Sequence, residues 1–154
     1  MNVLLAFSFW GHILGISIWV GSSLLVPLVI NPVSMALEPP SRMKFMAEFS
    51  RRAVPWIMGS IVLVFATGAL QFFLRHYSLG FNIITAKIVM ALLMAANGYY
   101  LGVVLAGRVG KLAPAPGTPP SPEFLKVQRM LVMHGWVQAG MAVVTVWLVG
   151  FLTA

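Results

Sequence analysis

The stretch VPWIMGSIVLVFATGALQFFL, residues 54–74, contains no charged side chain from end to end. About 20 apolar residues in a helix cross the roughly 30 Å of hydrocarbon in a bilayer. Three further stretches are almost as apolar, and they cover residues 3–30, 82–106 and 130–152. A β-barrel would require many short alternating strands, a pattern that the sequence does not show. Because backbone groups in lipid must bond to one another, we expect four transmembrane helices.

The composition leads to the same fold class. Of the 154 residues, 60% are hydrophobic and 8% are charged, whereas a soluble domain carries roughly 25% charged residues. The surface must therefore face lipid. We expect one domain over residues 1–154: an all-α, integral membrane four-helix bundle with up-down-up-down topology. The absence of cysteine excludes disulfides, iron–sulfur clusters, thiolate haem ligation and c-type haem attachment.

The links between the apolar stretches carry most of the proline. Pro32, Pro39 and Pro40 are predicted to stop the first helix. The basic amphipathic segment RMKFMAEFSRR, residues 42–52, is expected either to lie at the membrane interface or to extend the second helix. Five prolines in residues 111–124 predict an exposed, non-helical loop, after which residues 123–129 form a helical lead into the last stretch.

The distribution of positive charge predicts the orientation. The first and third links carry eight lysines and arginines, whereas the opposite face carries Arg75 alone. The positive-inside rule places those two links in the cytoplasm and both termini on the outer, periplasmic side of the inner (plasma) membrane. The net charge of +7 therefore reflects topology and contact with anionic lipid, with no role in nucleic-acid binding. The first stretch lacks a preceding basic segment, so we expect a retained helix rather than a cleaved signal peptide.

Ionisable residues inside a membrane are costly and by default suggest function. His12 and Lys87 lie well inside their stretches, and a rise of ~1.5 Å per residue places both at nearly the same level in the outer half. His134 falls roughly 18 Å from His12 along the membrane normal, too far for both to bind one iron unless the fourth helix is shifted. His76 lies closer to the level of His12, near the outer surface.

Each of these residues also has a simpler explanation. The imidazole of His12 can bond across to a neighbouring helix, and Lys87 can extend its ammonium outward to the headgroups. His76 can be an ordinary loop residue, and His134 can lie near the headgroups. Three tryptophans fit an interfacial belt: Trp10, Trp56 and Trp147.

A b-type haem site would draw several features together. Haem needs an imidazole ligand, a flat apolar slot, and small residues where helices approach the ring. Gly15 and Trp19 lie on or near the face of His12, and Gly68 lies at a comparable depth on the second helix. We therefore predict haem b with His12 as an axial metal ligand. The sixth position stays open between Lys87, His76 and His134.

Three segments together resemble the CopD/HemJ superfamily of small membrane proteins. They are HILGISIWVGSSLLVPL at residues 12–28, FSRRAVPWIMGSIVLVFATGAL at residues 49–70 and FNIITAKIVMALLMAANGYYLG at residues 81–102. The resemblance implies b-type haem and, in the HemJ branch, oxidation of protoporphyrinogen to protoporphyrin. It also implies that His12 and Lys87 lie at the haem. The chain departs from that pattern at Asn97, where HemJ-like proteins tend to have histidine.

The sequence thus favours a b-type haem protein that takes part in electron transfer, alone or as a small subunit of a larger redox complex. Its partners would be the lipid bilayer and other membrane redox subunits or a quinone, and a homo-oligomer is compatible with this role. Whether it is itself an oxidoreductase stays open. The alternatives are a HemJ-type enzyme using Arg51 or Arg52 for propionates, a CopD-type copper protein using methionine and histidine, and a structural subunit without a cofactor.

Overall fold

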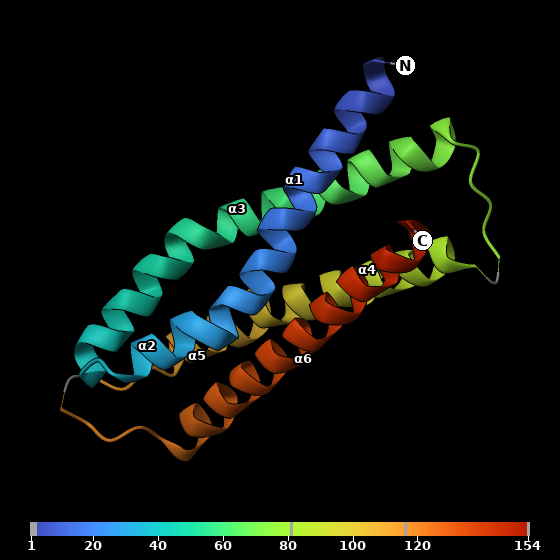
Figure 1. Cartoon of the computed structure of the whole chain (residues 1–154). Coiled ribbons are helices and arrows are strands. Elements are labelled where there is room, and N and C mark those ends of the chain that lie inside the picture. Colours follow the sequence, from blue (N-terminus) through green and yellow to red (C-terminus); the bar gives the residue numbers. More distant parts are fainter. Residues whose placement is uncertain (1–2, 81, 116, 154) are drawn as a thin grey trace.

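The computed structural model describes residues 3–80, 82–115 and 117–153 of the chain, and all regular elements in these ranges are helices. Four helical stretches are long and apolar enough to cross a membrane, and they are Val3–Met35, Pro39–Leu74, Ile83–Lys111 and Pro122–Leu148. The predicted all-α class and the four apolar helices are confirmed (Figure 1).

The first stretch is longer than predicted. It consists of α1 (Val3–Leu25), the π-helical turn η1 (Val26–Ile30) and α2 (Asn31–Met35). The prediction that Pro32 would help to stop this helix was wrong. In a π-helical turn each N–H bonds five residues back, and here the Asn31 N–H bonds the Val26 carbonyl. This wider turn gives a proline ring the room that a regular α-helical turn denies it.

Helix α3 (Pro39–Leu74) has 36 residues. Pro39 and Pro40 occupy its first turn, where a missing N–H leaves no bond unmade. Of the two alternatives for residues 42–52, the structure shows the extension of the second helix. At ~1.5 Å per residue α3 is about 54 Å long, so one end must project beyond ~30 Å of hydrocarbon. The charged end, which carries Glu48 with Arg51 and Arg52, is the one suited to do so.

The second half of the chain contains α4 (Ile83–Tyr99), a second π-helical turn η2 (Tyr100–Leu105), α5 (Ala106–Lys111) and α6 (Pro122–Thr153). The Asn82 side chain caps α4 by accepting a hydrogen bond from the Thr85 N–H at 2.9 Å. The proline-rich link is non-helical over residues 112–115 and 117–121, as predicted, but Lys111 still belongs to α5 and α6 already begins at Pro122, which as proline suits the first turn of a helix. The lead into α6 is helical, as predicted.

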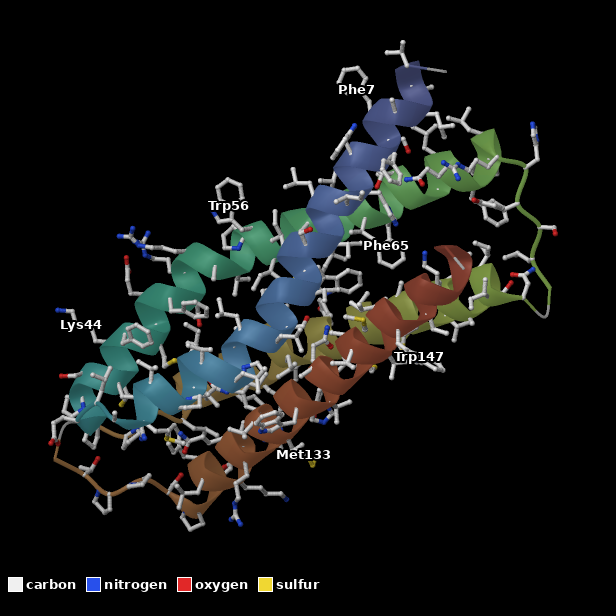
Figure 2. The ribbon with its side chains drawn as sticks, in the orientation of Figure 1. Phe7, Lys44, Trp56, Phe65, Met133 and Trp147 are labelled. Carbon is white, nitrogen blue, oxygen red and sulfur yellow. The ribbon has the colours of Figure 1, made fainter. Side chains whose placement is uncertain are left out.

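The helices pack as two pairs that α1 joins. Helix α1 packs along α3, α4 packs along α6, and α1 also contacts α6 (Figure 1). A small core of Trp19, Val64, Met94 and Ala142 fills the space where these helices meet. Figure 2 shows Trp56 and Trp147 on the outside of the bundle, and more than 60% of each is exposed. Such an exposed apolar surface suits a lipid environment.

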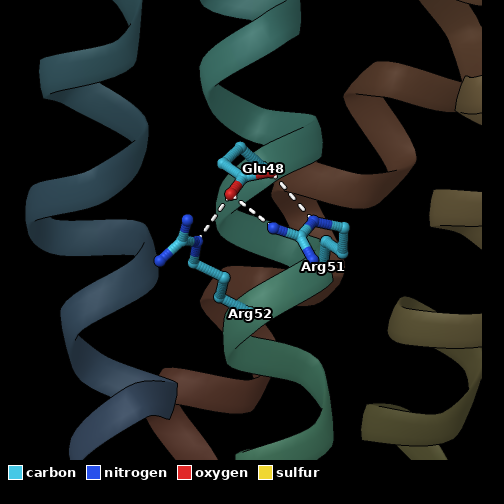
Figure 3. A network of polar contacts seen from close by, with 3 residues as sticks. All are labelled: Glu48, Arg51 and Arg52. Atoms are coloured by element: carbon cyan, nitrogen blue, oxygen red, sulfur yellow. Dashed lines mark hydrogen bonds and ion pairs between the residues drawn. The ribbon is translucent and has the colours of Figure 1, made fainter.

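Basic residues gather at one end of the bundle. The start of α3, the whole of α5 and the start of α6 lie together there (Figure 1), and Arg108 of α5 pairs with Glu123 of α6 at 3.1 Å. On α3, Glu48 accepts hydrogen bonds from both Arg51 and Arg52 (Figure 3). The charge asymmetry found in the sequence is therefore an asymmetry between the two ends of the molecule.

Candidate functional site

His12 lies on the face of α1 that packs against α3. Gly15 lies on the same face, one turn further along, where the two backbones approach closely. A Cβ atom added to Gly15 would lie 2.8 Å from Val64 Cγ2 and 3.1 Å from the Ser60 carbonyl oxygen. Gly15 therefore faces α3 and allows the close crossing, as small residues do between membrane helices.

The contacts of the His12 ring decide which nitrogen carries its proton. Nδ1 lies 3.1 Å from the Val64 carbonyl oxygen and 3.0 Å from Thr67 Oγ1. A carbonyl oxygen can only accept, so Nδ1 must carry the hydrogen. The Thr67 hydroxyl donates to the Leu63 carbonyl oxygen and is free to accept from Nδ1. The neutral ring therefore has its lone pair on Nε2, which is the atom that can bind a metal.

Small and polar groups of both helices fix the position of this ring. A Cβ atom added to Gly68 would lie 3.1 Å from His12 Cε1, so the glycine makes room for the imidazole. Toward the N-terminal end of α1, Ser8 Oγ donates to the Thr67 carbonyl oxygen at 3.1 Å. Gln71 Nε2 donates to the Ser8 carbonyl oxygen at 3.2 Å. The α1–α3 contact is thus polar around His12, although both helices are apolar overall.

Lys87 of α4 is the charged group near this ring. It is half-buried and close enough to His12 for an electrostatic interaction between the two. In the described part of the chain its ammonium forms no hydrogen bond and no ion pair. Lys87 thus acts on His12 at a distance rather than through a hydrogen bond, and within the described residues no anion is paired with the cation.

The other predicted site residues lie elsewhere. His76 is exposed in the turn after α3, with a left-handed φ of 52°. Trp19 is buried in the core, 3% exposed, and packs against the ring of Phe65. Arg51 and Arg52, the proposed propionate ligands, lie about 18 Å along α3 from Val64 and are already bonded to Glu48.

His134 belongs to a second polar cluster, between α4, α6 and α1. Its Nδ1 lies 2.7 Å from Asn97 Oδ1. Asn97 Nδ2 donates to Gln138 Oε1 at 2.8 Å, and Gln138 Nε2 contacts Ser23 Oγ at 3.5 Å. Ser23 and His12 are eleven residues apart on α1, about 16 Å along its axis. The two histidines thus belong to separate clusters at different levels.

Sequence reasoning missed the partners in both clusters. Thr67 and the Val64 carbonyl were not predicted to contact His12, and Asn97 was not paired with His134. Polar residues at these positions are visible in the sequence, but only the helix packing shows which of them meet. Among the described residues, no group of three or more His, Cys, Asp or Glu side chains comes together. A haem differs from a bare ion here, because its macrocycle supplies most of the iron ligands.

Comparison with known proteins does not assign the chain to a family. No protein-family model matches it, and no match was found among curated proteins or among solved structures.

Proposed function

We propose that this chain is a multi-pass membrane protein that binds a b-type haem through Nε2 of His12. The single observation that carries the proposal is the fixed tautomer of that ring. Histidines that bind metals usually donate their other N–H to a carbonyl or carboxylate, which orients the ring and makes the ligand more basic. The Val64 carbonyl and the Thr67 hydroxyl hold His12 in this state.

Lys87 supports a ligand that carries negative charge. A lysine in the membrane region is costly unless an anion pairs with its ammonium or a metal binds its deprotonated amine. A haem would bring two propionate carboxylates and an iron, so Lys87 would either pair with a propionate through its ammonium or bind the metal through its deprotonated amine. His76 and His134 are less suited to the sixth position, because one is exposed in a turn and the other is bonded in a separate cluster.

Bound haem would supply an iron that accepts and releases one electron. In this chain His12 would hold and orient it, and the apolar helices around the site would keep water away. This role is electron transfer, alone or with other membrane redox subunits. We further propose that the basic end faces the cytoplasm, so that both termini and the His12 level lie toward the outer side of the plasma membrane.

Pyridine haemochrome and Soret spectra of the purified protein test the haem proposal. The wild-type chain is expected to contain haem b, and His12→Ala is expected to lose it. His76→Ala and His134→Ala are the matched controls, because each removes an imidazole outside the proposed site, and both are expected to retain haem. Full haem content in His12→Ala, or its absence from wild-type protein supplied with haem, contradicts the proposal.

A further inference from the structure

Helix α3 carries a shallow groove along one face near its charged end. The groove has a volume of about 720 Å³, and the described residues that line it all belong to α3. They recur every three or four residues, which places them on one face of the helix. Its main lining residues are Lys44, Phe45, Glu48, Phe49, Arg52 and Trp56. Figure 2 shows Lys44 and Trp56 pointing away from the other helices, so this face is open to the surroundings of the protein.

The floor of the groove is apolar and continues into the membrane. The rings of Phe45 and Phe49 stack, with their centroids 6.4 Å apart and an angle of 19° between their planes. Trp56 follows Phe49 by seven residues, about 10.5 Å along the helix. It belongs to the apolar stretch 54–74 and is 73% exposed, and tryptophan is enriched where hydrocarbon meets headgroups. One end of the groove therefore faces lipid chains and the other end faces the headgroups.

The rim of the groove carries more positive than negative charge. Lys44, Arg51 and Arg52 lie around a single carboxylate, that of Glu48, which accepts hydrogen bonds from both arginines (Figure 3). Arg52 reaches Glu48 through Nε, and within the described residues its two terminal nitrogens form no hydrogen bond. Lys44 has no ion pair in the same part of the chain. The surplus of two cations favours an anion and disfavours a second copy of the chain, whose groove carries the same charge.

We propose that the groove binds an anionic phospholipid from the leaflet at the basic end of the protein. The phosphate binds the terminal nitrogens of Arg52, because a guanidinium group forms strong hydrogen bonds with phosphate, and Lys44 adds attraction for the headgroup. One acyl chain lies along Phe49 and Trp56. An acidic segment of a soluble protein would satisfy the cations and leave the Trp56 end uncovered, whereas a phospholipid matches both ends. This site does not depend on a haem at His12.

Quenching of Trp56 fluorescence by brominated lipids tests the site. The purified chain is placed in phosphatidylcholine vesicles that contain a small fraction of brominated phosphatidylglycerol or of brominated phosphatidylcholine, with bromine at the same acyl position. The difference between wild type and Trp56→Phe isolates the Trp56 signal. Each cation near an anionic lipid contributes about 1 kcal/mol, a factor of about 5, so the two surplus cations predict a preference of about 25-fold for phosphatidylglycerol at Trp56. Trp147 of α6, which is also exposed, should show equal quenching by both lipids when it is isolated in the same way with Trp147→Phe.

Arg52→Gln and Lys44→Gln change exposed side chains, and each should lower the preference about 5-fold. Lys111→Gln is the matched control, because it removes one charge from the same end of the molecule on α5, outside the groove. It should leave the preference unchanged. Equal quenching of Trp56 by the two lipids, or an effect of Lys111→Gln as large as that of Arg52→Gln, overturns the proposal. So does a lack of quenching by either lipid, which a second copy seated on the groove would cause. Haem content measured on the same samples tests the His12 site separately, because neither result requires the other.

Discussion

Gly15→Ala should loosen the α1–α3 contact on which the His12 site depends. The new methyl group would lie 2.8 Å from Val64 Cγ2, 3.1 Å from the Ser60 carbonyl oxygen and 3.3 Å from the Val64 backbone nitrogen. Carbon atoms pack best at about 3.5–4.0 Å. The Val64 methyl can rotate away, but the two backbone atoms move only if α3 moves. Overpacking of this kind costs about 1–3 kcal/mol, while replacing glycine in a helix gains at most about 1 kcal/mol.

Subtracting a gain of about 1 kcal/mol leaves an expected net loss of about 0–2 kcal/mol of unfolding free energy, measured by reversible unfolding in mixed micelles, and a loss of about 1–3 kcal/mol relative to an alanine variant that gains the same helix propensity without overpacking. Gly21→Ala and Gly59→Ala are the matched controls on the same two helices, because a Cβ atom at either position meets nothing within 4 Å. Both should be neutral or slightly stabilising. A separation of the helices also lengthens the Nδ1 contacts of His12, so haem content should fall in Gly15→Ala alone. If Gly15→Ala is as stable as Gly21→Ala, the close crossing is not as tight as described.

Three further outcomes follow from the same contacts. Thr67→Val removes one acceptor of His12 Nδ1 while keeping the side-chain shape, and should weaken haem binding about 10- to 100-fold in a haem titration. Unchanged affinity would show that the Val64 carbonyl alone is enough to orient the His12 ring. Asn97→Leu deprives the second cluster of its central amide and should cost about 1–3 kcal/mol in unfolding with haem content unchanged; a loss of haem would mean that the two levels are coupled. The proposed orientation can be tested by cysteine labelling, because the chain has no cysteine of its own. An impermeant thiol reagent should label Ser78→Cys in intact cells, whereas it should label Thr118→Cys only after permeabilisation. The reverse pattern would show that the orientation is inverted.

The fold was predictable because lipid imposes a single strong requirement. Any stretch such as residues 54–74 must satisfy its backbone groups internally, and a helix is the only structure that one isolated segment can form. Helix ends were harder to predict. Pro32 is a helix breaker by its local chemistry, yet η1 precedes it and the helix continues to Met35. Proline acts on hydrogen bonds four residues back, and a π-helical turn changes that register in a way the sequence pattern does not reveal.

The candidate site was predictable in part. His12 and Lys87 stand out because charge and imidazole are rare inside apolar stretches, and counting residues from the helix centres predicts that they lie at one level. Gly15 and Gly68 were expected near a cofactor, but in the structure one faces the backbone of α3 and the other the imidazole itself. A glycine in a membrane helix indicates a close approach without indicating what approaches. That depends on the rotation of each helix about its axis, which packing sets.

The two histidine rings have the same tautomer but different neighbours. Both histidines donate from Nδ1 and present Nε2 as an acceptor. His12 has the ammonium of Lys87 within electrostatic range, so a ligand with negative charge, such as haem with its propionates, is favoured there. His134 instead packs against the neutral ring of Tyr100. A ligand with negative charge is therefore favoured at His12 over His134, because a charge without a counter-charge is costly in a membrane.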